Sequence, residues 1–64
     1  MFSNFLNTYY KPIKNYKIGA YLMKHDYEKY FNTYISEDDF IEIMNSYGYK
    51  HNRRNQFKFT KISF

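Results

Sequence analysis

The strongest hydrophobic pattern in the chain lies between residues 36 and 48. Four apolar residues there follow the i, i+3, i+4 and i+7 spacing of one helix face: Phe40, Ile43, Met44 and Tyr47. Ser36 is a good N-cap, and Asp39 three residues later forms an acidic variant of the capping box. Gly48 occupies the C′ position, where a left-handed backbone conformation commonly ends a helix. The pattern therefore predicts a helix over 37–47.

Two weaker patterns occupy the N-terminal part, and each has two interpretations. Residues 1–12 are predicted to form an N-terminal arm or a short helix. This segment should stop before Pro12, because the residue that precedes a proline avoids helical geometry. Residues 13–24 fit either a helical stripe or a strand at Lys17–Leu22, since Gly19 weakens a helix.

A further helix is predicted just before the strong one, with Asp26 as its N-cap. Its apolar face consists of aromatic residues at helical spacing: Tyr27, Tyr30, Phe31 and Tyr34. The helix either continues through Tyr34 or ends at an Asn32–Thr33 turn. The second alternative leaves Tyr34–Ile35 as a short strand.

The C-terminal residues change in character and favour extended structure. A polar turn is predicted at His51–Asn55, between strands at Tyr49–Lys50 and Gln56–Ile62. Phe57 and Phe59 alternate with polar neighbours, so they share one face of the last strand. The predicted fold is therefore α+β and winged-helix-like, with two or three helices and a C-terminal β-hairpin.

The length and composition predict a single small domain over residues 1–64. A chain of this size buries only about 60% of its unfolded surface, so its core is marginal. No cysteine is present, which excludes disulfides and thiolate metal sites. Seven Phe and nine Tyr must therefore supply the buried surface, and a homodimer is a common solution for chains this short.

Charge is strongly segregated beneath the net value of +4. Residues 1–25 hold four lysines and no acid, residues 26–42 hold six acids and one lysine, and residues 43–64 hold five cations and no acid. One interpretation is structural, with basic ends attracted to an acidic middle. The other is functional, with a basic face for phosphates and an acidic face for another partner.

No catalytic or cofactor-binding motif is present, so a non-enzymatic protein without cofactors is expected. The pair His25–Asp26 lacks the further ligands that a metal site needs. The acids at 37–42 are better explained by the favourable field at a helix N-terminus. Neither glycine belongs to a phosphate-binding loop.

The basic C-terminal segment is the leading candidate site. Its phosphate donors are Lys50, His51, Arg53, Arg54, Lys58 and Lys61. Arg53 and Arg54 stand at the expected tip, from which a wing can follow a minor groove. Phe57 and Phe59 stack unpaired bases if they are exposed, but packing beneath the helix is the favoured interpretation.

The run Tyr34-Ile-Ser-Glu-Asp-Asp-Phe-Ile-Glu-Ile-Met-Asn-Ser-Tyr-Gly-Tyr-Lys50, followed by Arg53-Arg54 and Gln56-Phe-Lys-Phe59, resembles the C-terminal winged helix of phage and plasmid helicase–primases. The resemblance covers about 30 residues. It implies a wing role for Arg53 and Arg54, a core role for Phe40 and Met44, and a turn role for Gly48. The chain departs from that family where the helix before the wing carries acids that repel phosphate.

Two functions follow as hypotheses. The first is nucleic-acid binding, to DNA or RNA, by a protein of a phage or mobile element, since the residue usage favours AT-rich codons. The second is an inhibitor or adaptor, of the anti-CRISPR kind, that docks on a host protein through Glu37, Asp38 and Glu42. No signal peptide or membrane span is recognisable, so a cytoplasmic location is expected.

Overall fold

The computed structural model describes residues 2–62 of the chain. Within them, three helices are formed: α1 (Phe2–Tyr9), α2 (Ala20–Phe31) and α3 (Glu37–Ser46). Four short strands accompany the helices: β1 (Tyr10–Pro12), β2 (Ile18–Gly19), β3 (Gln56–Phe57) and β4 (Phe59–Lys61). β1 pairs with β4 and β2 pairs with β3, both antiparallel, so the predicted α+β class is confirmed. These elements do not confirm the finer winged-helix assignment.

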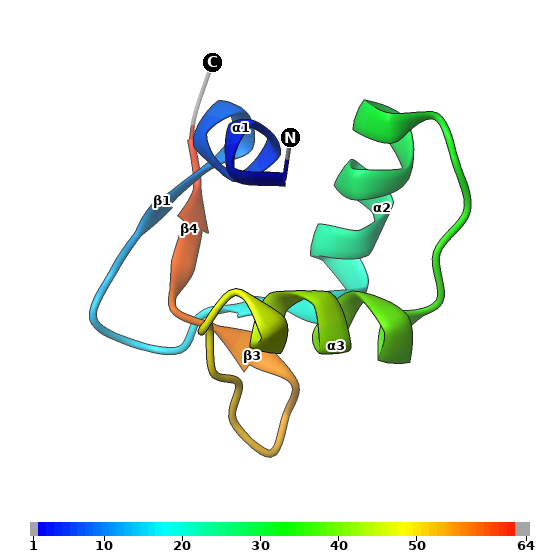
Figure 1. Cartoon of the computed structure of the whole chain (residues 1–64). Coiled ribbons are helices and arrows are strands. Elements are labelled where there is room, and N and C mark those ends of the chain that lie inside the picture. The colour runs from blue at the N-terminus through cyan, green and yellow to red at the C-terminus, as the bar shows by residue number, and fades with distance from the viewer. Residues whose placement is uncertain (1, 63–64) are drawn as a thin grey trace.

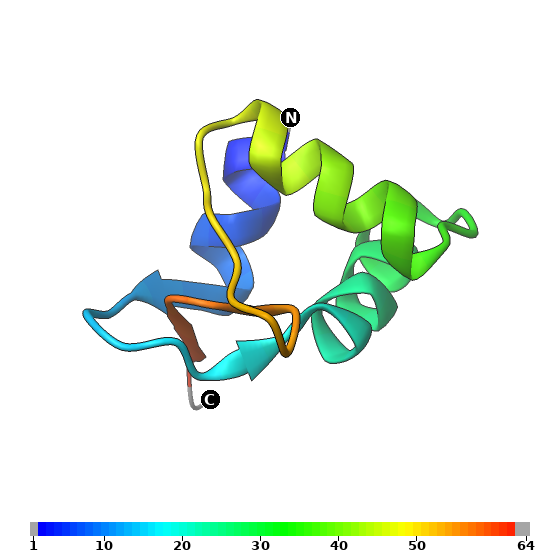
Figure 2. The same ribbon diagram turned by 90° about the horizontal axis from the view of Figure 1, so that it is seen from below.

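Residues 10–19 and 56–61 form one interrupted ribbon, in which β1 and β4 lie side by side (Figure 1). Opposing residues fix the register: Tyr10 with Lys61, Lys11 with Thr60, Pro12 with Phe59, Ile18 with Phe57, and Gly19 with Gln56. The Ile13 amide donates to the Lys58 carbonyl at 2.9 Å, and the Lys17 amide donates to the Phe57 carbonyl at 3.0 Å. Residues 13–17 therefore bow out of the ribbon opposite Lys58, on the side away from α2 (Figure 2).

The prediction of a C-terminal β-hairpin is wrong, because the last strand pairs with a different segment of the chain. Tyr49–Lys50 form no strand, and residues 56–61 pair with residues 10–19 instead. The reason lies at the end of α3, where the Tyr49 amide donates to the Met44 carbonyl at 3.0 Å. This bond holds Tyr49 against the helix and prevents it from extending beside β4. The polar turn at 51–55 is nevertheless present.

Helix α3 confirms the prediction drawn from its sequence. The Ser36 hydroxyl accepts the Asp39 amide at 3.2 Å, so the N-cap is in place. At the other end Gly48 has φ of 91°, and the amides of Gly48 and Tyr49 reach back to the last turn as in a Schellman motif. Tyr47, predicted to continue the apolar face, is 59% exposed, and its ring stacks on that of Phe2 with centroids 4.8 Å apart.

Helix α2 begins six residues before the predicted N-cap at Asp26. Gly19 occupies the N-cap position, and the Ala20 amide donates to the Asn55 carbonyl at 2.8 Å. The helix therefore continues directly from the ribbon, and Asp26 lies buried in its middle. Of the two predicted ends, the structure has the one at Asn32–Thr33, with Asn32 as a left-handed C-cap, but no strand forms at 34–35.

Phe5 lies at the centre of an aromatic core to which all three helices contribute. Its fully buried ring is edge-on to Tyr27 at 5.7 Å and to Phe40 at 6.5 Å between centroids. Phe2 and Leu6 are also buried, so residues 2–9 form the short helix rather than an arm. From the ribbon, Phe57 and Phe59 both face this core, as their shared parity predicts. No helix within residues 2–62 has the length and hydrophobicity to cross a membrane.

Candidate nucleic-acid interface

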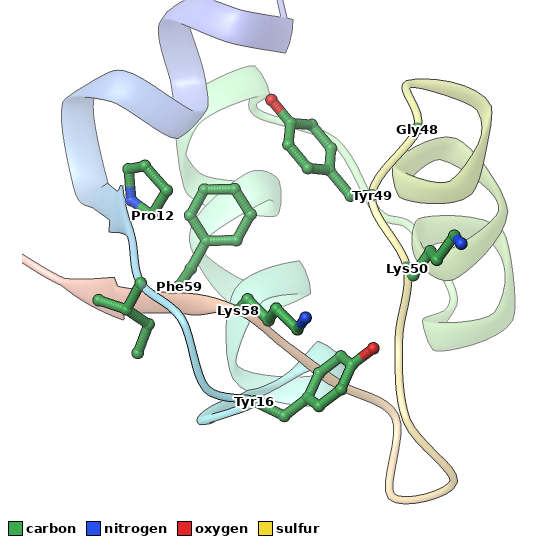
Figure 3. A pocket seen from close by; sticks show the side chains of 8 residues that line it. Pro12, Tyr16, Gly48, Tyr49, Lys50, Lys58 and Phe59 are labelled. Atoms are coloured by element: carbon green, nitrogen blue, oxygen red, sulfur yellow. The ribbon is translucent and has the colours of Figure 1, made fainter.

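An open groove of about 290 Å³ lies between the bowed segment 13–17, the chain that follows α3, and the junction of β3 with β4 (Figure 3). It combines aromatic, aliphatic and basic side chains from three separate stretches of sequence. The lining residues are Pro12, Ile13, Tyr16, Gly48, Tyr49, Lys50, Lys58 and Phe59.

The end of α3 positions one side of the groove. Gly48 adopts a left-handed conformation, which turns the chain so that Tyr49 and Lys50 follow immediately on the rim. The Tyr49 ring lies edge-on to Phe59, with centroids 5.2 Å apart, and remains 36% exposed. Phe59 is 5% exposed and therefore belongs to the core beneath the groove. Tyr49 thus contacts the core through Phe59 and keeps part of its surface exposed beside the groove.

The ribbon positions the other side. Lys58 stands at the interruption between β3 and β4, opposite the outward bow of residues 13–17. That bow carries Tyr16, whose ring centroid lies 4.9 Å from the Lys58 ammonium nitrogen. This distance is typical of a cation–π contact. Tyr16 is also 36% exposed, so a half-exposed tyrosine lies on each side of the groove.

The electrostatic character of the groove is one-sided, because no carboxylate is among its lining residues. The buried or half-buried acids are engaged elsewhere: Asp26 pairs with Lys61, Glu28 pairs with Lys24, and Glu37 accepts an amide hydrogen from Asn55. Within residues 2–62, neither Lys50 nor Lys58 forms an ion pair. A phosphate that enters the groove therefore meets two cations whose charge is not compensated locally.

Two further predicted donors, Arg53 and Arg54, lie exposed at the tip of the 51–55 turn rather than in the groove. Asn52 organises this turn. Its side-chain oxygen accepts the amide of Arg54 at 3.0 Å and that of Gln56 at 2.9 Å. The backbone of the tip is thereby fixed, while the guanidinium groups remain available to solvent.

The last two predicted donors, His51 and Lys61, already have protein partners. His51 is half-buried, with Nδ1 3.3 Å from the Asn45 side-chain oxygen. The ammonium group of Lys61 lies 3.0 Å from a carboxylate oxygen of Asp26. Of the six predicted donors, only Lys50 and Lys58 are therefore brought together in one concave site.

Asp26 is the centre of a structural network. It accepts a hydrogen bond from the Tyr10 hydroxyl as well as the contact from Lys61. Burial raises the pKa of Tyr10, and the neighbouring Asp26 carboxylate raises it further through the hydrogen bond and its charge. His25, adjacent in sequence, turns to Glu28 instead, with 3.3 Å between Nδ1 and the carboxylate. The described residues contain no group of three or more metal-ligating side chains of the His, Cys, Asp and Glu types.

Two of the three acids predicted to form an exposed face on α3 are exposed. Asp38 and Glu42 are exposed, whereas Glu37 is half-buried and tied to Asn55 at 3.3 Å. A shallow hollow of about 360 Å³ lies along this helix, lined by Ile35, Asp39, Glu42, Ile43 and Ser46. It is a second surface, separate from the groove and opposite in charge.

Sequence reasoning missed Tyr16 and Tyr49 as candidate site residues. Neither belongs to a motif, and each gains its significance only when the ribbon and the end of α3 meet. The sequence offers only a weak signal, a tyrosine near a lysine along the chain, and the helical stripe proposed for residues 13–24 assigned Tyr16 to a helix face instead. A comparison with known protein families, curated proteins and solved structures finds no match to this chain.

Proposed function

We propose that the protein is a non-enzymatic nucleic-acid-binding module whose contact surface is the basic groove together with the Arg53–Arg54 tip. The observation that carries the proposal is a groove without carboxylates that Lys50 and Lys58 line from two different segments. The Lys58 ammonium group lies against Tyr16 in the groove, and the Lys50 side chain extends outward from its rim (Figure 3). Contacts between lysine or arginine and backbone phosphates provide most of the affinity in weakly sequence-specific binding. The same cations attract either DNA or RNA.

We also propose a reduced winged-helix arrangement, in which the 51–55 turn takes the place of a wing. The order of elements supports it, since α2 and α3 precede a basic turn and a strand. The departure is that Tyr49–Lys50 do not pair as a strand. The residue usage that favours AT-rich codons supports an origin in a phage or mobile element.

The acidic face of α3 determines how nucleic acid is expected to approach. Asp38 and Glu42 are exposed on α3 and repel phosphate, so this helix is a poor candidate for insertion into a major groove. The groove lies beyond the C-terminal end of that helix and carries the opposite charge. The 51–55 turn runs alongside α3, with His51 near Asn45 and Asn55 bonded to Glu37. The proposal therefore assigns binding to the groove side of the molecule.

The test is a salt titration of binding to a fluorescently labelled oligonucleotide. For Lys50→Ala with Lys58→Ala, the log–log salt slope should become shallower by about 0.7 for each lost contact to a single strand, or about 0.9 for a duplex. Lys29→Ala is the matched control, because Lys29 is exposed on α2 and does not line the groove. Absence of binding to DNA and RNA at low salt would contradict the proposal.

A second candidate function is docking on a basic host protein, as an inhibitor or adaptor. It is favoured by the hollow on α3, where Ile35 and Ile43 provide apolar contact and Asp39 and Glu42 provide negative charge. Such a combination suits a partner that presents an apolar side chain within a basic surface. Recovery of a host protein that is lost on reversing the acidic residues would favour this candidate.

A further inference from the structure

We infer that the groove binds an unpaired base against the rings of Tyr16 and Tyr49, so that the ligand is single-stranded nucleic acid. This inference rests on the proposed function and adds the kind of nucleic acid that the site prefers. It is carried by the aromatic half of the groove, which phosphate attraction alone does not require.

The exposure of the two tyrosines separates them from the aromatic core. Tyr16 and Tyr49 are each 36% exposed, whereas Phe59 beneath them is 5% exposed. Burying aromatic surface is favourable, so rings left half-open in a concave site are positioned to bury more on binding. Both are labelled on the walls of the groove in Figure 3, and they come from segments distant in sequence.

The lysines lie where the phosphates of such a ligand are expected. Lys58 rests against the Tyr16 ring, and Lys50 directly follows Tyr49 in the chain. A base that stacks on Tyr16 therefore has the Lys58 cation beside it to meet the sugar–phosphate chain. Lys50 extends from the opposite rim, where a neighbouring phosphate of the same strand can reach it (Figure 3). Aromatic rings combined with a basic groove are the usual means of binding single strands without sequence preference.

A duplex can use the lysines of this site but not its tyrosine rings. Its phosphates can reach Lys50 and Lys58, but the faces of its bases are stacked on one another and are not available to a tyrosine ring. Stacking on the tyrosines is therefore open only to an unpaired or splayed base. Single-stranded ligands should gain a contribution from the rings that duplexes of similar charge do not.

The first experiment compares an oligothymidylate with an abasic oligonucleotide of the same length, which keeps the phosphates and lacks the bases. The wild-type protein should bind the oligothymidylate about 5- to 150-fold more tightly, the range expected for one stacked base. Tyr16→Leu should remove most of that preference, and Tyr16→Phe should keep it. Tyr34→Leu is the matched control, since Tyr34 is 79% exposed and lies outside the groove.

Thermal melting of the Tyr16 variants checks that they fold, which is expected because this side chain is on the surface. Equal affinity for the oligothymidylate and the abasic strand would overturn this inference, while salt-dependent binding of both would leave the proposed function standing. Absence of binding to any oligonucleotide would overturn both.

The second experiment locates the ligand. The chain has only two glycines, and Gly48 lines the groove whereas Gly19 belongs to β2. In a nitrogen–proton correlation spectrum, the oligothymidylate should shift the Gly48 amide more than the Gly19 amide, which pairs with Gln56 beside the 51–55 turn. A bound oligothymidylate that shifts Gly19 and not Gly48 would overturn the assignment to the groove.

Discussion

Lys58 and Lys61 are three residues apart in the same C-terminal segment, and they have opposite environments. Lys61 contacts the buried Asp26 carboxylate, and its ammonium group lies 5.9 Å from the ring centroid of Tyr9. Lys58 has no acid within reach among the described residues and rests over Tyr16 at the edge of an open groove. One lysine therefore helps to hold the fold together, and the other is available to a ligand.

The difference arises from what each lysine faces across the ribbon. Lys61 lies opposite Tyr10 in a regular pair, close to the helix that carries Asp26. Lys58 stands at the interruption, where residues 13–17 move outward and leave space beside it. A count of positive charges along a strand therefore does not identify which of them are free to bind phosphate.

The largest expected effect is on the free energy of unfolding, through the Asp26 carboxylate that Lys61 contacts. Asp26→Ala removes the acceptor of the buried Tyr10 hydroxyl and the partner of Lys61. The hydrogen bond to a charged group contributes about 1.5–3 kcal/mol. The half-exposed ion pair adds about 0.2–1 kcal/mol. Unfolding in urea should therefore show a loss of about 2–4 kcal/mol. Asp26→Asn keeps an acceptor for Tyr10 and should lose less; equal losses would indicate that Tyr10 does not depend on this acceptor.

The stability of the fold is expected to fall at alkaline pH, because of the buried Tyr10 hydroxyl that donates to Asp26. The pKa of Tyr10 is raised by burial and by Asp26 above its ordinary value of 10.0. Its contribution to stability is therefore complete below pH 10 and declines as pH rises, because the unfolded chain releases the proton while the folded chain retains it. The decline approaches about 1.4 kcal/mol per pH unit.

Tyr10→Phe isolates this contribution from those of the other tyrosines, which both proteins share. The free-energy difference between wild type and Tyr10→Phe, measured in urea at a series of pH values, should be constant up to about pH 10 and shrink above it. A difference that stays constant through the alkaline range would show that the folded protein does not hold this proton.

Local sequence signals were sufficient to predict α3. Its N-cap, its two fully buried residues and its terminal glycine all act within one or two turns of the helix, so they can be recognised without knowledge of the rest of the fold. The aromatic core and the shared face of Phe57 and Phe59 follow for the same reason. Parity and composition are local properties of the chain.

The ribbon and the site were not predictable in the same way. The partner of residues 56–61 lies more than thirty residues earlier, and no local pattern chooses it over the nearby 49–50 segment. The same limit applies to Asp26, which looks like a helix cap in sequence and becomes a buried partner of Lys61. Only the lysines of the candidate groove were predicted, because Tyr16 and Tyr49 are brought to the same groove by tertiary structure.

A smaller effect should separate the two lysines in binding. Lys58→Ala should make the salt slope of single-strand binding shallower by about 0.7, the value for one lost phosphate contact. Lys61→Ala should leave that slope nearly unchanged, because its charge is already paired with Asp26. Anisotropy titrations of both variants at several salt concentrations provide the measurement.

The stability of the same two variants should show the reverse order. Lys61→Ala should destabilise the fold by up to about 1 kcal/mol, as expected for a half-exposed ion pair, and Lys58→Ala should have a smaller effect. Equal salt slopes of binding for the two variants would contradict the different roles assigned to the two lysines, since both would then contribute equally to phosphate binding.

The smallest effect on oligonucleotide binding is expected for the exposed acids of α3, which contrast with the buried Asp26. Asp38→Lys with Glu42→Lys changes two exposed side chains, each of which should alter stability by no more than about 0.5 kcal/mol. Asp38 lies in the first turn, so its reversal adds a loss of about 0.3–1 kcal/mol from the helix dipole. The total loss of stability should therefore be at most about 2 kcal/mol in thermal melting, and oligonucleotide binding should persist. Loss of host-protein capture in this double variant, with folding retained, would favour the acidic face as the functional surface. Capture that survives in this variant and is lost in Arg53→Ala with Arg54→Ala would favour the nucleic-acid proposal.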